Sequence, residues 1–341
     1  MCLPVEFHQE RIVKKNIRIK DIADESGVSI GAVSRALKGQ PGLSDETRQR
    51  VLSIARAKGY DFTRLRTNKI KRILFLLHRQ HDLSKALPFY SPLILEIENS
   101  CRKQGIAMSF LAIQPGDPIQ EQLQVHNPDA VICGGFFEPE LLAALQHSNV
   151  PITLVDLWYP DLPCVNPDTY EGGYLATRHL IDSGRQRIAF LASTNSHYSI
   201  RQREKGYRKA LYEAQILLPP EYELASPPLL DIEQSLIANL NELLALSEPP
   251  DAIFAYNDVA AMVALRVCQQ KGFRVPQDIA IVGFDNIDYS LLTTPALSTI
   301  AVDKKQLAQR TFDLVMQSTD ETNILLPVQL VVRGSSVSSD S

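Results

Sequence analysis

The chain has 341 residues, more than one ordinary domain of roughly 100–200 residues contains, so two or three domains are expected. Hydrophobic residues make up 45% and charged residues 22%, a composition that excludes a disordered, collagen-like or disulfide-scaffold chain. The apolar runs are far shorter than the ~18 residues of a membrane span and no signal-peptide core is present, so we expect a cytoplasmic protein.

The formal net charge of -4 hides a strong asymmetry along the chain. Residues 1–72 contain 16 Lys and Arg against 8 Asp and Glu, a net charge of +8, which leaves -12 on the remaining 269 residues. A compact basic segment on an acidic protein suits attraction to the phosphate backbone of nucleic acid. The alternative is a solvated basic tail.

Three short helices are predicted in this basic segment, over residues 18–60. Two amphipathic helices lie within 19–37, where Gly27 can supply the tight turn and Ser29 can cap the second helix. A third helix is predicted from Ser44 to a stop at Gly59. The pattern is that of a helix-turn-helix domain.

After a basic connector at 61–72, apolar runs alternate with helical patterns. Strands are predicted at 73–77, 106–113, 130–133, 152–155, 188–192, 252–256, 279–284 and 328–332. Helices are predicted at 92–104, 138–147, 172–183, 203–215, 231–246, 259–271 and 304–317. This alternation predicts an α/β region of two doubly wound parallel-sheet lobes behind an all-α helix-turn-helix head.

The head carries a specific motif, and the motif identifies a resemblance. Its parts are Asp21-Ile22-Ala23, Gly27-Val28-Ser29, Val33-Ser34-Arg35, Thr47-Arg48-Gln49-Arg50-Val51 and Gly59-Tyr60. The run resembles the DNA-binding head of the LacI/GalR family of bacterial transcription regulators, and the remainder resembles the family's periplasmic-binding-protein-like effector domain. The resemblance covers about residues 18–334 and implies a homodimer on a pseudo-palindromic operator.

Domain limits follow from the pattern and from the three chain crossings between lobes that the resemblance implies. We expect a disordered extension at 1–17, the head at 18–60, a short hinge at 61–72, the effector and dimerisation domain at 73–334 and an unstructured tail at 335–341. Lobe one should comprise about 73–167 and about 299–326, and lobe two about 168–298 and about 327–334.

Residues at the start of the second helix should read the DNA, because that helix enters the major groove. The resemblance implies base contacts from Ile30, Gly31 and Arg35, and phosphate contacts from Ser29 and Ser34. Ile30 could instead be a core residue, and Arg35 could contact a phosphate rather than guanine.

Two departures from the family pattern concern the head and the connector. Arg18 stands where the family usually has a Thr cap, a loss of about 1 kcal/mol unless a residue such as Asp21 compensates. The connector reaches Leu65 about four residues sooner than in relatives, which puts a full hinge helix in doubt. Leu65 could wedge into the minor groove or could pack within the protein.

Candidate effector-binding residues follow predicted strands or face the expected cleft, where open parallel sheets bind ligands. By resemblance they are Phe89, Tyr90, Asp156, Arg203, Asn257 and Asp285. Their paired donors and acceptors suit vicinal hydroxyls, and aromatic faces such as Trp158 suit a sugar ring, so a mono- or disaccharide is expected, with a purine base or nucleoside as the alternative.

Several neighbours of these residues have two interpretations. Asp258 is expected to cap a helix rather than bind ligand, and Phe284 is either core or site. Asp168, with Gly172 and Gly173, should shape the lobe crossover. His78, Arg79, Gln80 and His81 either select the effector or form a solvated loop, and we favour the loop.

No motif favours catalysis, a metal or a cofactor. The sequence lacks nucleotide-binding glycine loops, a nucleophile elbow and a zinc-protease motif, and its seven histidines and five cysteines show no metal spacing. We expect a ligand-controlled repressor. The other classes are an architectural DNA-binding protein that has lost its ligand response, which no small molecule would stabilise thermally, and an enzyme on a doubly wound fold, which the basic helix-turn-helix disfavours.

Overall fold

The structure, a computed structural model, describes residues 17–37, 42–58, 60, 70–79, 87–148, 150–192, 197–225, 232–317, 319 and 321–337. The chain forms two units, Met1–Lys69 and Ile70–Ser341. Within the described ranges, no helix is both long and apolar enough to cross a membrane.

The first unit contains the three predicted helices. They are α1 (Ile19–Ser26), α2 (Ile30–Leu37) and α3 (Asp45–Ala57). Ile22, Val33 and Val51, one from each helix, are fully buried and form its small core with Ala55 and Tyr60. The helix-turn-helix head is therefore confirmed, while Gly59 and Leu65 lie outside the described residues.

Local hydrogen bonds explain where these helices begin. Gly27 has the left-handed φ of 69° that the tight turn requires, and the Ala32 N–H donates to Ser29 Oγ at 3.2 Å. At the start of α1, the Arg18 N–H donates to Asp21 Oδ2 at 2.7 Å. The Asp21 carboxylate thus satisfies the backbone N–H of Arg18, which is one half of a capping box.

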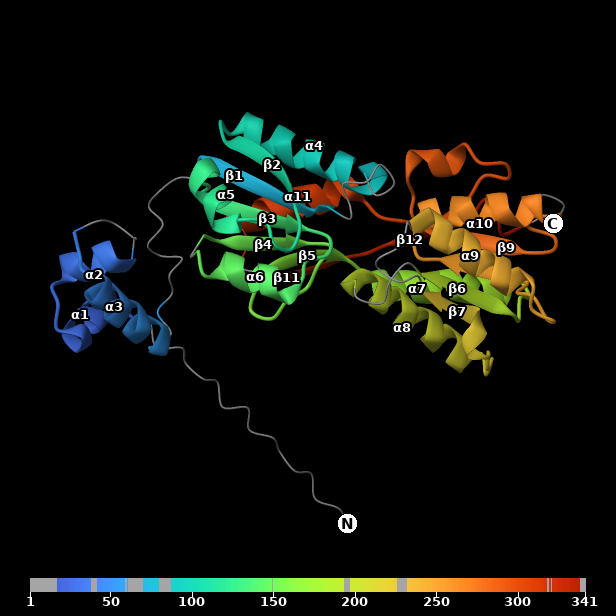
Figure 1. Ribbon diagram of the computed structural model, residues 1–341, viewed down its shortest axis with the longest axis horizontal. Helices are drawn as coiled ribbons and strands as arrows, with labels where there is room; N and C mark the ends of the chain where they lie inside the picture. The colour runs from blue at the N-terminus through green and yellow to red at the C-terminus, as the bar shows by residue number, and fades with distance from the viewer. Residues whose placement is uncertain are drawn as a thin grey trace, which may run out of the picture. The chain divides into compact units, whose positions relative to one another are not determined.

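The second unit begins with a six-stranded parallel sheet, in the order β11-β5-β4-β3-β1-β2 (Figure 1). Its strands are β1 (Arg72–His78), β2 (Ala107–Ile113), β3 (Ala130–Gly134), β4 (Ile152–Val155), β5 (Cys164–Pro167) and β11 (Asn323–Leu326). Helices α4 (Leu87–Lys103) and α11 (Lys304–Val315) cover one face, and α5 (Ile119–His126) and α6 (Pro139–Gln146) cover the other. Phe75 packs against α4 and α11, and Leu76 packs against α5 and α6. Both faces of β1 are therefore covered, and its residues 73–77 are all apolar.

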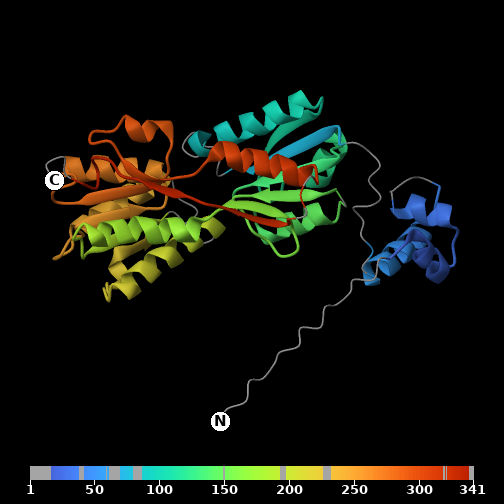
Figure 2. The same ribbon diagram turned by 180° about the vertical axis from the view of Figure 1, so that it is seen from behind.

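A second six-stranded sheet has the order β12-β10-β9-β8-β6-β7 and is parallel except for β12. Its strands are β6 (Ile188–Ala192), β7 (Glu223–Ala225), β8 (Ala252–Ala255), β9 (Ala280–Asp285), β10 (Ser298–Ala301) and β12 (Gln329–Val331). Helices α7 (Thr169–Asp182) and α8 (Tyr198–Glu213) cover one face, and α9 (Ile232–Leu244) and α10 (Asp258–Gln270) the other (Figure 2). Short 3-10 helices lie at η3 (Pro220–Tyr222) and η4 (Asp288–Leu291).

The chain passes between the two sheets three times, after β5, after β10 and after β11. We use lobe one and lobe two for the regions around the first and second sheets. β10 (Ser298–Ala301) lies in the second sheet, so the expected start of the returning segment at about 299 is wrong by about three residues, because residues 299–301 still pair within lobe two.

The C-terminal region is ordered further than predicted. The Ser335 side chain is fully buried and its hydroxyl donates to the Ile281 carbonyl at 2.6 Å, while Ser336 Oγ lies 2.7 Å from Ser298 Oγ. An unstructured tail from 335 is therefore wrong for residues 335–337. Their serine hydroxyls bond to the beginnings of the interior strands β9 and β10.

Candidate functional site

The DNA-facing candidates lie on and before α2. Ile30 is 54% exposed, so the core alternative for it is wrong. Gly31 and Arg35 are exposed, and Arg35 Nε donates to the Gly31 carbonyl at 3.4 Å along the helix. Ser34 is half-buried beside them. These residues offer one apolar and one cationic side chain to a groove, and their contact with DNA stays a prediction.

In lobe one, Tyr90 and Asp156 form one half of the effector-site candidate. Both side chains are buried, and the Tyr90 hydroxyl donates to Asp156 Oδ2 at 2.7 Å. Burial, followed by the charge of Asp156, raises the pKa of Tyr90 well above its usual value. Phe89, buried next to Tyr90, presents its ring at 86° with 5.0 Å between ring centroids. Asp156 directly follows β4, as expected for the carboxyl end of a parallel strand.

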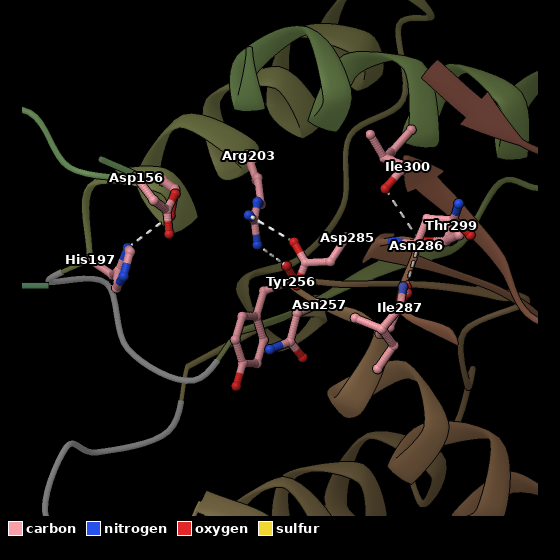
Figure 3. Close-up of polar contacts among 12 residues, drawn as sticks. Asp156, His197, Arg203, Tyr256, Asn257, Asp285, Asn286, Ile287, Thr299 and Ile300 are labelled. Atoms are coloured by element: carbon pink, nitrogen blue, oxygen red, sulfur yellow. Dashed lines mark hydrogen bonds and ion pairs between the residues drawn. The ribbon is translucent and has the colours of Figure 1, made fainter. Parts of the chain in front are cut away.

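In lobe two, Arg203 organises the other half (Figure 3). Its buried guanidinium donates to the Tyr256 carbonyl and lies 3.5 Å from Asp285 Oδ1. The same group stacks 3.8 Å above the ring of Phe284. Phe284 is therefore both core and site, because one face of its fully buried ring supports the arginine.

The two halves interact electrostatically. Burial raises the pKa of Asp285 to about 6, the nearby cations Arg203 and Lys304 oppose the rise, and Asp156 in lobe one adds to it. The site thus joins two carboxylates from different lobes around one guanidinium. A ligand that changes the separation of the lobes also changes this balance.

Asn257, and not Asp258, caps helix α10. Asn257 Oδ1 accepts the Ala260 N–H at 2.8 Å and caps α10, so the expected cap at Asp258 is wrong. Asp258 is fully buried, where Oδ2 accepts the Ile287 N–H at 2.8 Å and Oδ1 accepts the Thr299 hydroxyl at 2.5 Å. Burial raises the pKa of Asp258 to about 7. The structure therefore ties Asp258 to the loop after β9.

The glycines near the first crossing have a packing role. A Cβ on Gly173 would lie 2.2 Å from the Arg203 carbonyl oxygen, and one on Gly172 would lie 2.5 Å from Phe284 Cε2. Asp168 caps α7 by accepting the Glu171 N–H at 2.9 Å. Gly173 thus allows α7 to approach the backbone of α8 at Arg203, and Gly172 leaves room for the Phe284 ring on which the arginine stacks.

Several residues of the site were not predicted. His197 is buried, and its ring lies 6.2 Å from the ring of Phe136 in lobe one. Figure 3 shows it pointing toward Asp156. Burial lowers the pKa of His197 to about 3, with smaller effects from Arg203, Arg201 and His78. The available signal was position, because His197 falls between the carboxyl end of β6 and the start of α8.

A second aromatic pair spans the lobes. The rings of Trp158 and Tyr198 stack with 6.3 Å between centroids. His78 is also buried, with Nε2 3.1 Å from Glu138 Oε1, so a solvated loop is wrong for this residue. Arg79 is exposed, whereas Gln80 and His81 lie outside the described residues. Aromatic faces, carboxylates and a guanidinium together suit a flat or ring-shaped polar molecule.

Among the described residues, no three His, Cys, Asp or Glu side chains lie close enough together to hold a metal ion. The four cysteines in those ranges, Cys101, Cys133, Cys164 and Cys268, are buried free thiols.

Two family comparisons match separate parts of the chain. Residues 18–61 match the bacterial regulatory proteins of the lacI family, and residues 177–336 match the periplasmic binding protein-like domain. The first match coincides with the helical head, and the second covers most of lobe two together with the returning elements α11 and β11 of lobe one.

Whole-chain relatives point the same way. The HTH-type transcriptional repressor PurR of Mannheimia succiniciproducens is 31% identical over 319 residues, covering 88% of this chain and 91% of the relative. A repressor of the same name from Photobacterium profundum is 28% identical over 320 residues, which cover 89% of this chain and 92% of the relative.

Solved structures share the fold. A transcriptional regulator CelR–cellobiose complex has a TM-score of 0.71 at 24% identity, over 94% of this chain and 100% of its own. A LacI family transcriptional regulator from Enterococcus faecium with bound ribose has a TM-score of 0.68 at 26% identity, over 78% of this chain and 99% of its own.

Proposed function

Since the chain belongs to the lacI family of bacterial regulatory proteins and is a DNA-binding repressor with an effector-binding domain, we propose that a purine base bound between its lobes controls operator affinity. The arrangement of Tyr90 and Asp156 in lobe one opposite Arg203 and Asp285 in lobe two carries this proposal. Hydrogen-bonding groups from both sides can read the edge of a flat ring that bridges the lobes.

Aromatic residues around that arrangement favour a planar heterocycle. Phe89 and Tyr90 form an aromatic wall in lobe one, and Trp158 and Tyr198 form a stacked pair from the two lobes. Stacking of a base on such faces adds affinity beyond hydrogen bonding. The relatives that carry the PurR name also point to a purine, which was the second choice from sequence.

A sugar is the second candidate effector, and it was the first expectation from sequence. The ribose bound by the Enterococcus faecium regulator, 26% identical, supports it. Carboxylate and guanidinium pairs bind vicinal hydroxyls as well as they bind a base edge. The two candidates therefore differ mainly in their need for stacking.

A thermal-shift screen distinguishes them. Adenine, guanine, hypoxanthine and xanthine would be compared with ribose, glucose and cellobiose at matched concentrations. A ligand at 1,000 times its Kd stabilises the folded state by about 4 kcal/mol. Stabilisation by one or more bases and by no sugar is the expected result. Stabilisation by sugars alone would overturn the purine proposal, and no response from any compound would overturn effector control by either class.

DNA recognition is proposed to use a homodimer on a pseudo-palindromic operator, because one head reaches only one major-groove half-site. Ser29, Ile30, Gly31, Ser34 and Arg35 are the proposed contact set in the head, and Leu65 is proposed as the minor-groove wedge. Binding to a full operator and to a half-site duplex, compared at several salt concentrations, tests this. Equal affinity for both duplexes would argue against the dimer.

Effector occupancy is proposed to act by changing how the lobes close. A ligand shifts such an equilibrium only through different affinity for the two arrangements, with a coupling of about 1–3 kcal/mol in typical cases. Operator affinity measured with and without the stabilising base gives this coupling directly. An unchanged operator affinity would contradict it.

A further inference from the structure

The loop that follows β9 carries the Asp285 carboxylate in an unusual backbone conformation. Asp285 has φ 106° and Asn286 has φ 48°, both in the region that side-chain-bearing residues rarely adopt. Such conformations persist only where surrounding contacts impose them. The contacts that hold this loop therefore decide where the carboxylate points.

Most of the contacts on this loop come from lobe two itself. The Ile287 N–H donates to Asp258 Oδ2 at 2.8 Å, and the Asn286 N–H donates to Thr299 Oγ1 at 3.3 Å (Figure 3). The guanidinium of Arg333, which follows β12, donates to Asn286 Oδ1 at 2.7 Å. These contacts lie within lobe two, so they do not depend on the angle between the lobes.

Lys304 differs because it belongs to the other lobe. It is the first residue of α11, the helix that packs beside α4 on the first sheet, directly after the second crossing. Its ammonium donates to the Asp285 carbonyl at 2.5 Å and to the Asn286 carbonyl at 3.2 Å. The same Nζ lies 5.8 Å from the centroid of the Phe89 ring in lobe one.

The charge of Lys304 is therefore held between an aromatic wall of one lobe and two carbonyls of the other. Burial lowers the pKa of Lys304, while Asp285 and Asp258 oppose this effect. Hydrogen bonds and cation–aromatic contacts both require short distances. Lys304 can therefore keep its two carbonyl hydrogen bonds and its contact with the Phe89 ring only over a narrow range of angles between the lobes.

We propose that Lys304 is a positioning residue that fixes the Asp285–Asn286 backbone relative to lobe one and so couples the effector carboxylate to the angle between the lobes. The inference rests on the proposed function, because the ligand of Asp285 is taken to be the effector. Lys304 acts through the main chain of the loop. Its removal should therefore weaken effector binding and loosen lobe closure together.

The test compares Lys304→Met, which removes the charge and the donors, with Lys304→Arg, which keeps both. Lys305→Met is the matched control, because Lys305 is the next residue of α11 and is exposed. The first measurement is acrylamide quenching of Trp158, the chain's single tryptophan, which stacks on Tyr198 across the lobes. It needs no effector. The second is calorimetric binding of adenine, guanine, hypoxanthine and xanthine.

We expect Lys304→Met to raise the Trp158 quenching constant in ligand-free protein and to weaken base binding roughly tenfold or more, the effect of one hydrogen bond from a charged donor. Lys304→Arg should restore most of both properties, and Lys305→Met should match the wild type. If Lys304→Met fails to fold, Lys304→Leu replaces it under the same criteria, since it also removes the charge and the donors.

Wild-type quenching and wild-type base affinity in Lys304→Met would overturn the proposal. So would a Lys304→Arg variant as impaired as Lys304→Met, because the role would then be packing rather than donated hydrogen bonds. A wild-type protein that binds none of the bases contradicts the proposed effector instead. In that case the quenching comparison still decides the role of Lys304.

Discussion

Replacing Gly206 by Ala is expected to force helices α7 and α8 apart. A Cβ at Gly206 would lie 2.0 Å from the Tyr170 carbonyl oxygen and 2.6 Å from the Tyr174 amide nitrogen. Non-bonded heavy atoms normally stay about 3.5 Å apart, so the helices must separate by about 1 Å or more. Both obstacles are backbone atoms, which cannot rotate away as a side chain could.

The energetic cost follows from this geometry. Overpacking a core costs about 1–3 kcal/mol, and the rigid obstacle places this substitution at the upper end. Alanine recovers about 1 kcal/mol through its better helix propensity. A net loss of about 2 kcal/mol should lower the melting temperature by roughly 4–8 °C in a unit of this size.

Effector binding should weaken as well. Arg203 lies on α8, and the Arg203 backbone contacts Gly173 of α7, so separating the two helices should displace the arginine. Thermal unfolding followed by circular dichroism, and calorimetric titration with the stabilising base, measure the two effects. Lys205→Ala, an exposed change on the same helix, is the control and should stay within about 0.5 kcal/mol of the wild type. A Gly206→Ala protein as stable as this control would refute the close-packing argument.

Three further predictions concern the head, lobe one and pH. Arg35→Ala should weaken binding to the preferred operator by about 1–3 kcal/mol and relax preference at one base position; an equal loss on random DNA would show that Arg35 meets only phosphate. Tyr90→Phe removes the 2.7 Å hydrogen bond to Asp156 and should cost about 1–3 kcal/mol of stability, which denaturant unfolding measures; an unchanged midpoint would contradict a role for this bond. The pKa of Asp258 is raised to about 7, above its value in the unfolded chain, so ionisation of Asp258 destabilises the fold. The stability of the wild type relative to Asp258→Asn should therefore rise as the pH falls from about 7 to about 4. The slope should be at most about 1.4 kcal/mol per pH unit. A difference that is constant with pH would exclude a titrating Asp258.

The strongly patterned elements were predictable from the sequence because local chemistry decides them. The strands at β4 and β6 coincide with the predicted limits, since each is a short, fully buried and mainly apolar run. The three helices of the head follow from their caps and amphipathic spacing. In these elements the local preference and the final packing agree.

Other elements depend on partners far along the chain. β5 and β10 contain polar residues such as Asn166 and Ser298, and β11 alternates between exposed and buried positions at the sheet edge. Their strand state comes from pairing with β4, β9 and β5, which no local pattern reveals. The serines at 335 and 336 look like tail residues until their hydrogen-bond acceptors are known.

The site shows the same division. Asp156, Arg203 and Asp285 stand next to strand ends or family motifs, and the structure brings them together with Tyr90. His197, Phe136 and Lys304 acquire their roles only when the two lobes meet. The position of His197 after a strand was a sequence signal, but its contact with the other lobe could not be read from the sequence. Contacts across lobes are long-range in sequence and depend on the assembled fold.

The three crossings affect how the protein can be made. During synthesis the head, within Met1–Lys69, leaves the ribosome first and contains its own core. The first sheet lacks β11 until residue 326 has been added, and the second lacks β12 until residue 331. Neither lobe can finish folding before nearly the whole chain exists. An interrupted chain would therefore present a complete DNA-binding head on an effector domain that cannot close, and its occupation of an operator would be beyond the control of any ligand.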